Sequence, residues 1–432
     1  MSLFGAFTNS VQAMQTQSHS LGVISQNIAN VNTTGYKEAQ DLFKTNLSET
    51  TSGTNIFGVK PVTRQLIDFQ GPITTGQNWD DLALNGSGFF ITNSNGTTSG
   101  NTSFTRSGVF GTTDVPPASA TGTTTGTGSS SGTSSNPTAS GKITYMTDGA
   151  GNYLMGYGAT GAPTGPNSAT NSLSGLQPIQ YQMGSLMAAK PTSSVTVQGT
   201  LPANATSASG VGLPVYDQSG NSQTLTMNWT QTSSNTWSLA FSVNAANGTV
   251  SNTTPTTVTF DGNGKIVSPT STTANISWAD GSSSSVNVDM SKLQQLASGT
   301  FSVGQISQDG YPAGNLDQVA FDSSGVLTGS YTNGKTQVLG QVAVAQFPNP
   351  DGLQTLSGTT FQQTAAAGQI QVGTVGSFAG QTQVVPNALE QSNVKMEDQF
   401  SQMIMTQKAY SSAAEVFKTA DEMTTNAKDL IT

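Results

Sequence analysis

The sequence predicts a mainly β protein with α-helical termini. Apolar residues at both ends recur at spacings of three and four, whereas the long middle alternates apolar and polar residues with a period of two. Gly, Ser, Thr and Asn dominate this middle, and turn dipeptides such as Asn85-Gly86, Asp261-Gly262 and Asn333-Gly334 recur along it. We therefore expect β-rich modules inserted between helical ends.

The N-terminal segment predicts a helix with an apolar seam. The a and d positions of its heptads are occupied by Phe4, Phe7, Val11, Met14, Leu21 and Ile28. An isolated helix of this length is marginally stable in water, so the seam needs a partner helix. The helix should end in SQNIANVNTTGYK (25–37), where Asn30 or Asn32 tolerates left-handed geometry and Gly35 permits a turn.

The C-terminal segment supplies the partner. Residues 389–431 contain neither Gly nor Pro, and Pro386 precedes them as a candidate helix start. One apolar stripe comprises Phe400, Met403, Tyr410, Ala414 and Phe417, and an adjoining stripe comprises Val416, Ala420, Met423, Ala427 and Leu430. We expect the two helices to pair as a coiled-coil-like domain. The stripes are wide enough to contact neighbouring subunits as well.

Within the middle, two adjacent segments predict a β-hairpin. Every second residue is apolar in TLTMNWT (224–230) and again in TWSLAFSV (236–243), and a short polar loop joins them. The run QVLGQVAVAQF (337–347) predicts a well-buried strand. Residues 115–141 carry no charge and almost no large apolar side chain, so we expect a low-complexity surface insertion there.

Composition argues against several classes of protein. Only 9% of residues are charged and the net charge is −9, without any basic run, which argues against nucleic acid as a partner. The absence of Cys excludes disulfides and thiolate metal sites, and the single His19 argues against multi-His metal sites. Because no Ser, Asp or Glu stands at a useful spacing from His19, we do not expect a His-based catalytic triad either. We also expect neither a cleaved Sec signal nor a membrane span.

Motifs that resemble active sites have simpler interpretations. DGNGK (261–265) lacks the further acidic ligands and closing Glu of a calcium loop, so we expect a β-turn. GTTTGTGSSSG (122–132) lacks the Gly-Lys-Ser/Thr of a phosphate loop. The paired acids Asp80-Asp81, Glu397-Asp398 and Asp421-Glu422 show no spacing that singles out a catalytic pair. We expect no catalytic residue, no cofactor, no metal and no enzyme activity.

Both ends of the chain carry motifs of a known family. SQNIANVNTTGYK resembles the N-terminal signature of the bacterial flagellar rod and hook axial proteins, an NIAN core followed by N-T-x-G-[YF]-K. LEQSNVKMEDQFSQMIMTQKAY (389–410) is similar to their C-terminal signature, although Glu397 is shifted by a residue or two. The matching positions are Asn27, Ile28, Ala29, Asn30, Asn32, Gly35, Tyr36, Lys37, Glu390, Ser392, Asn393 and Val394.

Further segments narrow this resemblance to the hook proteins. They are LMAAKPTSSVTVQGTLPA (186–203), QDGYPAGNL (308–316) and GSYTNGKTQVLGQVAVAQFPNPDGL (329–353). The resemblance implies a structural subunit of the flagellar hook, a curved extracellular tube that acts as a universal joint and transmits motor torque from rod to filament. It also implies export through the flagellar type III apparatus. The implied partners are further copies in a helical homopolymer and the rod, hook-cap and hook-filament junction proteins.

The resemblance also implies how the chain divides into domains. The expected parts are a terminal helical domain (1–35 and 386–432) forming an inner tube, a connecting segment (36–70), a β-rich middle domain (71–186 and 296–385) and a β-rich outer domain (187–295). Two alternatives stay open. A distal-rod-like axial protein shares the two ends but lacks the outer domain, and a secreted β-rich adhesin would carry a Sec signal and an acid pair or aromatic groove.

Overall fold

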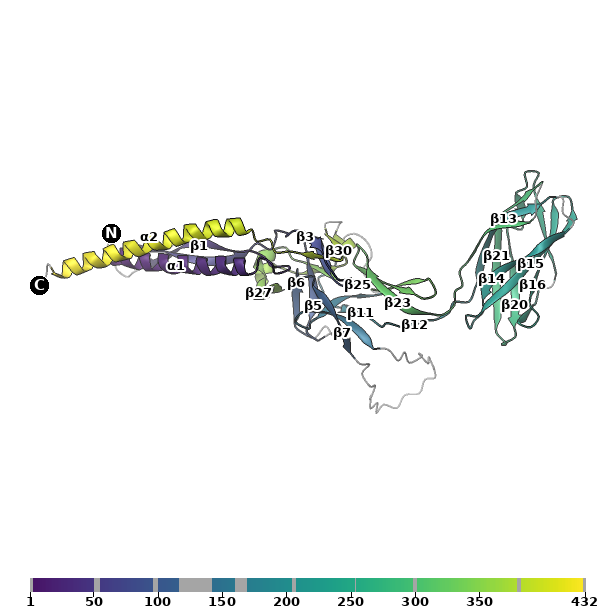
Figure 1. Ribbon diagram of the computed structural model, residues 1–432, viewed down its shortest axis with the longest axis horizontal. Coiled ribbons are helices and arrows are strands. Elements are labelled where there is room, and N and C mark those ends of the chain that lie inside the picture. The colour runs from purple at the N-terminus through teal and green to yellow at the C-terminus, as the bar shows by residue number, and fades with distance from the viewer. Residues whose placement is uncertain are drawn as a thin grey trace, which may run out of the picture.

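The structure is a computed structural model that describes residues 3–49, 55–95, 100–115, 142–159, 169–203, 207–252, 254–297, 301–378 and 382–429. The molecule is elongated, with both helices at one end, a β-sandwich at the other and a second β-rich part between them (Figure 1). We call these the arm, the outer unit and the middle unit. The predicted fold class, mainly β with α-helical termini, is confirmed.

The arm consists of two antiparallel helices and a hairpin. Helix α1 (Leu3–Ala29) lies along α2 (Met396–Asp429), and the rings of Phe7 and Phe417 pack with centroids 4.4 Å apart. The expected connecting segment instead contains a long hairpin, β1 (Ala39–Glu49) and β2 (Asn55–Gln65), which runs back along α1. The hydroxyl of Thr16 donates to the carbonyl of Val59 at 3.2 Å. Neither helix, over the residues described, is long and apolar enough to cross a membrane.

The C-terminal helix begins later than the sequence predicted. Pro386 is the last residue of β30 (Thr382–Pro386), and β31 (Ala388–Glu390) follows it, so the helix starts only at Met396. Lack of Gly and Pro permits a helix but does not require one. Here strand pairing with β4 (Leu82–Gly86) and β3 (Ile73–Thr75) and the burial of alternate residues decide the local structure.

The middle unit is built around one 15-stranded sheet. Phe89 and Phe90 in β5 are both buried, and they belong to two different apolar clusters on opposite faces of the sheet. The strands of this sheet before the outer unit are β5 (Phe89–Asn93), β6 (Thr102–Thr105), β7 (Phe110–Val115), β8 (Ile143–Asp148), β9 (Tyr153–Gly158), β10 (Gln177–Pro178), β11 (Gln180–Tyr181) and β12 (Leu186–Met187), whereas β3 (Ile73–Thr75) and β4 (Leu82–Gly86) pair separately with β31 and β30. Except for Val115, the predicted 115–141 insertion lies outside the described residues.

The strands that return from the outer unit complete this sheet. They are β23 (Gly314–Phe321), β24 (Val326–Tyr331), β25 (Thr336–Val342), β26 (Val344–Gln346), β27 (Gln354–Ser357), β28 (Thr360–Gln362) and β29 (Gln371–Gly373), with 3₁₀ turns at Pro350–Gly352, Ala365–Ala367 and Val375–Phe378. The segment 337–347 was predicted as one buried strand, which is wrong in part. It forms the separate strands β25 and β26, and Gln337 and Val338 are exposed at the start of β25.

The outer unit is a sandwich of two five-stranded sheets. One has the order β17-β20-β21-β13-β22 and the other β14-β15-β16-β18-β19. Its strands are β13 (Ser194–Pro202), β14 (Ser207–Tyr216), β15 (Ser222–Ser233), β16 (Thr236–Val243), β17 (Gly248–Val250), β18 (Thr256–Phe260), β19 (Ile266–Ser268), β20 (Ser271–Trp278), β21 (Ser283–Leu296) and β22 (Ser302–Gln308). Because β22 pairs with β13, the sandwich extends to Gln308, whereas the expected boundary at 295 falls inside β21.

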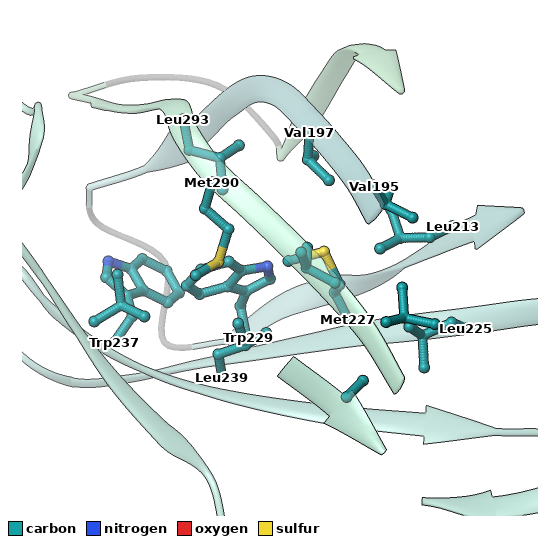
Figure 2. Packing of buried hydrophobic residues seen from close by; sticks show 14 of the residues in the cluster. Val195, Val197, Leu213, Leu225, Met227, Trp229, Trp237, Leu239, Met290 and Leu293 are labelled. Atoms are coloured by element: carbon teal, nitrogen blue, oxygen red, sulfur yellow. The ribbon is translucent and has the colours of Figure 1, made fainter. Parts of the chain in front are cut away.

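The predicted hairpin supplies much of the sandwich core. Strands β15 and β16 pair antiparallel with Trp229 opposite Leu239, which confirms the hairpin. Both Trp229 and Trp237 are fully buried, and Figure 2 shows them beside Met290 and Leu293 of the facing sheet. This core contains no residue of the arm, so the outer unit has its own apolar core.

Four hairpins close with the same side-chain device. One carboxylate oxygen accepts the backbone N–H groups two and four residues later, and a Gly with positive φ stands three residues later. The aspartates are Asp148, Asp217, Asp261 and Asp322. The turn predicted for DGNGK is thereby confirmed, and its carboxylate is engaged by the backbone.

Two neighbouring chain segments join the middle and outer units. Lys190 and Tyr311 exchange both backbone hydrogen bonds at 3.0 Å. Asp309 accepts the N–H groups of Ser193 and Ser194 at 2.9 Å and lies 3.1 Å from the Lys190 ammonium. Partial burial raises the pKa of Asp309, but the hydrogen bond from the Ser193 hydroxyl at 2.7 Å, the two N–H groups and the Lys190 ammonium outweigh it and hold the pKa below its usual range. The connection is therefore narrow but locally ordered.

Candidate functional site at the base of the arm

The two predicted signatures meet where the arm joins the middle unit. We call this region the joint and define it as residues 27–39 and 390–399 together with Arg106. Helix α1 ends at Ala29, and the side-chain amide of Asn30 donates to the carbonyl of Gln26 at 2.8 Å. Asn30 therefore caps the helix, and Gly35 rather than an Asn takes the left-handed conformation, with φ of 72°.

A buried charge cluster forms the centre of the joint. Glu390 is fully buried, and its two carboxylate oxygens lie 2.7 Å from Lys37 Nζ and 3.2 Å from Arg106 Nη1. The first oxygen also accepts the N–H of Gly71 at 2.9 Å, and the Glu390 carbonyl accepts the N–H of Gly35 at 2.7 Å. One residue of the C-terminal signature thus holds both the N-terminal signature and the middle unit.

The two cations of this cluster are almost as deeply buried as the carboxylate. Lys37 Nζ also donates to the carbonyl of Phe69 at 2.7 Å, and Arg106 Nη2 donates to the carbonyl of Gly86 at 2.8 Å. The guanidinium stands 5.5 Å from the centre of the Phe89 ring. Burial lowers the pKa of Lys37 and of Arg106, and the shared carboxylate opposes this in both cases. Two cations therefore depend on one anion.

Asn27 forms a second buried network, at the end of α1. Its amide donates to the carbonyl of Ala39 at 2.8 Å and to the side chain of Gln399 at 2.9 Å. Its carbonyl oxygen accepts the N–H of Ala39 at 2.9 Å and the hydroxyl of Tyr36 at 3.2 Å. All four hydrogen-bonding positions of the side chain are used. Asn27 therefore fixes the hairpin base and the start of α2 to the end of α1.

The same network continues into the middle unit. The Gln399 amide donates to Glu38 Oε1 at 2.8 Å, and the N–H of Glu38 donates to the Asn393 side chain at 2.7 Å. The Asn393 amide in turn donates to the carbonyls of Leu66 and Phe69 at 3.1 and 3.0 Å. Burial raises the pKa of the Glu38 carboxyl. The chain of bonds runs from α2 through the hairpin base to the loop before β3.

The remaining signature residues have lesser roles in the joint. Ser392 and Val394 are buried, and the N–H of Val394 donates to the Ser392 hydroxyl at 3.3 Å. Ile28 is half-buried, whereas Ala29 and Asn32 are exposed. Apart from Arg106 Nε, which is buried without a hydrogen-bond partner, the donors and acceptors described above are engaged by one another, so this arrangement holds segments together and offers no free nucleophile or base among these contacts.

Close backbone packing at Gly35 leads to a prediction with a matched control. A Cβ on Gly35 would lie 2.5 Å from Ser107 N, and positive φ adds strain, so Gly35→Ala should destabilise the monomer by about 1–3 kcal/mol. Gly22→Ala lies on the exposed side of α1 with nothing within 4 Å, so it should stabilise α1 by up to about 1 kcal/mol. Thermal unfolding followed by circular dichroism compares them. If Gly35→Ala unfolds at the same temperature as the parent or higher, Gly35 is not required for the close backbone packing against Ser107.

The predicted seam residues divide between covered and exposed positions. Half-buried positions in the arm are Phe7, Val11, Met14, Leu21, Met403, Ala414 and Phe417. Phe400, Tyr410 and Met423 are exposed instead. Phe4 belongs to α1, but its side chain and the whole of Leu430 lie outside the described residues. The helix pair therefore leaves much of the apolar surface of α2 uncovered.

Sequence reasoning missed several arm residues because it did not anticipate the hairpin. Val23 and Ile24 are the most deeply buried apolar residues described in α1, although neither belongs to the predicted seam. His19 was expected to lack an acidic neighbour, which is wrong. Its ring nitrogen lies 2.9 Å from Asp41 of β1, and Thr63 of β2 donates to the same carboxylate at 2.7 Å. The available signal was that α1 carries apolar residues, Val23 and Ile24, outside its predicted seam, which indicates a second partner besides α2.

Three family models match the chain. A model described as the flagellar basal body protein FlaE D2 domain matches residues 188–311, which include the outer unit. Models described as the flagella basal body rod protein and the flagellar basal body rod FlgEFG protein C-terminal match residues 7–37 and 385–430. The two terminal matches cover the segments that meet at the joint.

Similar proteins are aligned over nearly the whole chain. The flagellar hook protein FlgE of Rhizobium meliloti is 31% identical over 437 residues, covering 98% of each chain. The flagellar hook protein FlgE of Treponema pallidum is 29% identical, covering 96% of each chain, and that of Salmonella typhimurium is 26% identical, covering 97% of this chain and 98% of its own. The crystal structure of Helicobacter pylori flagellar hook protein FlgE2 shares the fold with a TM-score of 0.51 at 13% identity, covering 73% of this chain and 100% of that one.

Proposed function

The chain belongs to the flagellar hook protein family as a structural subunit of the hook, and from that premise we propose that copies polymerise through their arms into a curved, flexible tube. The observation that carries this proposal is the uncovered apolar surface of the arm. On α2 alone, six large apolar side chains are exposed: Phe400, Ile404, Met405, Tyr410, Val416 and Met423. A soluble monomer rarely exposes a long apolar surface unless it has a partner.

The joint connects this assembly surface to the rest of the subunit. In the proposed tube, the arms form an inner layer, and the middle and outer units (roughly 71–385) form the shells around it. Torque applied at the arm passes through the Glu390 cluster and the Asn27 network, because these buried bonds tie the end of α1 and the start of α2 to the middle unit. Buried charge pairs fix one geometry, which suits a joint under load.

The outer surfaces suit a tube that bends while it rotates. One side of such a tube must shorten while the other lengthens, so neighbouring subunits have to slide past one another. With 9% charged residues, the chain relies on Ser, Thr, Asn and Gln for its polar surface. Contacts between such groups, often through water, exchange at small cost, whereas strong ion pairs would hold one register. The narrow connection at Lys190 and Tyr311 lets the outer unit adjust separately.

We extend the proposal to the setting in which the subunit works. The chain is exported through the flagellar type III apparatus without signal cleavage, and it lies outside the cell between the rod, the hook cap and the hook-filament junction proteins. It acts as a mechanical element rather than as an enzyme. A distal-rod role is the alternative, but the match of residues 188–311 to a D2-domain model favours a hook subunit.

Deleting the gene in the bacterium that encodes this chain tests the proposal. We expect cells that do not swim, with basal bodies that keep a complete rod but lack hook and filament, and restoration by the parent gene. The reason is that the filament has no base on which to assemble without the hook. Electron microscopy of isolated basal bodies provides the measurement. A shortened rod would favour the distal-rod role, and normal hooks would contradict both.

A further inference from the structure

The arm contains a groove formed by three elements. It encloses about 310 Å³ between α1, β1 and α2. Buried Val23 and Ile24 form its floor, and Phe43 of β1 and Met405 of α2 stand at its two edges, 52% and 60% exposed. Asp41 is the one charged residue among those that line it, and its carboxylate is already engaged by His19 and Thr63. The groove therefore offers an apolar floor and apolar edges, with uncharged polar side chains such as Gln17, Gln40 and Gln402 between them.

Helix α2 presents a second apolar face on its far side. Phe400 and Ile404 are one turn apart, and both are about half exposed. With 3.6 residues per turn, each residue advances about 100°, so Phe400 and the groove residue Ala409 point about 180° apart. The third side of α2, with Phe417, packs on α1. One apolar face of α2 therefore packs on α1, and the other two, the groove face and the face with Phe400 and Ile404, are available for contacts outside the chain.

Polymer geometry determines which surface meets the groove. Copies that share one orientation around a tube contact each other through different patches on opposite sides. The face with Phe400 and Ile404 and the groove face of α2 satisfy that condition. The first face spans residues 400–404 of α2 and the groove face spans residues 402–409, so the two ranges overlap. Their midpoints differ by three to four residues, so a copy whose first face enters the groove of its neighbour is shifted by only about 5 Å along the arm. A contact between unlike patches that repeats from copy to copy generates a ring or an open helix, and a non-zero shift along the arm favours the helix.

We propose that the groove between β1 and α2 is the seat for Phe400 and Ile404 of a second copy of this chain. The inference rests on the proposed function, because it assigns a particular contact within that polymer. Phe400 and Ile404 and the apolar groove edges Phe43 and Met405 are all about half exposed in the single chain, and the contact removes these apolar side chains near the base of the arm from water.

Engineered cysteines test this contact directly, because the chain has no Cys of its own. In the double variant Phe43→Cys/Ile404→Cys, position 404 does not line the groove that Phe43 borders, so we expect a disulfide between different copies rather than within one. A contact between unlike patches then extends from copy to copy. Oxidised polymer should give a ladder of covalent oligomers on denaturing gels, whereas each single variant gives at most dimers. Phe43→Cys/Met423→Cys, with another exposed residue of α2, is the control and should give no ladder.

The outcomes separate this inference from the proposed function. If tubes form but Phe43→Cys/Ile404→Cys gives no ladder, or if Phe43→Cys/Met423→Cys gives one instead, the proposed contact is wrong, whereas polymerisation itself still stands. A parent chain that forms no polymer overturns the proposed function itself. If the cysteines prevent assembly, Phe43→Ala and Ile404→Ala should each raise the critical concentration about tenfold, and the double variant should raise it by clearly less than the product. Independent effects that multiply would contradict the contact.

Discussion

Glu390→Ala is expected to destabilise the arm and middle unit by about 3–5 kcal/mol, the cost of leaving buried charges without their partner. Lys37 and Arg106 are 1% and 5% exposed, and both depend on this carboxylate. The loss should appear in urea unfolding and as faster hydrogen exchange at the joint. The outer unit has a separate apolar core, so its unfolding transition should not move and serves as an internal reference.

Charge balance predicts how related variants should rank. Lys37→Met leaves one cation with one carboxylate, so it should cost less than Glu390→Ala. The exposed pair Lys418 and Glu422, 3.9 Å apart, is the surface control, and Glu422→Ala should change stability by less than about 1 kcal/mol. If Glu390→Ala costs no more than that control, the charge cluster does not hold the joint.

The Glu390→Ala deficit should also depend on pH. Burial already lowers the pKa of Lys37, and losing the carboxylate lowers it further. Between this lowered value and the unfolded value the unfolded chain binds more protons, so the stability of the variant rises with pH. We therefore expect the deficit to narrow as the pH is raised from the Lys37 pKa of the variant to the less strongly lowered Lys37 pKa of the parent, above which both chains gain stability in parallel. A deficit that widens over this range contradicts the assignment.

Removing residues 415–432 is expected to give a folded monomer that cannot polymerise. The truncation deletes Phe417, which packs on Phe7, together with exposed Val416 and Met423. Residues 396–414 stay paired with α1 beside the joint, and none of the three buried apolar clusters of the β units uses a deleted residue. The middle and outer units should therefore keep their stability. Sedimentation at rising concentration should show polymer for the parent chain only.

A second variant distinguishes loss of the contact surface from general damage to the arm. Val416→Glu keeps the full length of α2 and its contact with α1 but places a charge on the exposed stripe, so it should raise the concentration needed for assembly. If the chain that lacks residues 415–432 forms normal tubes, assembly does not depend on this part of the arm, and the assignment is wrong.

The sequence predicted the elements with strong periodicity and missed those that depend on tertiary partners. Heptad spacing located both helices, and period-two alternation located the β15–β16 hairpin. The segment of hairpin β1–β2 was expected only as a connection. Its apolar residues lie on both faces of the hairpin, so the sequence shows no simple alternation, and neighbouring copies are proposed to cover the exposed ones. Pro386 was taken as a helix start, yet strand pairing with β4 continues to it.

The joint shows the same division between local and long-range information. Its residues were found through the two signatures, but their pairing was not visible in the sequence. Lys37 and Glu390 are 353 positions apart, and Asn27 and Gln399 are 372 apart. Arg106 lies in neither signature. Only the approach of both ends of the chain to the middle unit brings these groups within hydrogen-bond distance.

Electron microscopy of the purified full-length chain shows whether this subunit assembles itself through its arm. The protein should be monomeric when dilute and should form tubes of constant diameter, curved along their length, when concentrated. The inner layer of those tubes should consist of paired helices, with the β units outside. Amorphous aggregate, or persistent monomer at concentrations that saturate the solution, would contradict the account.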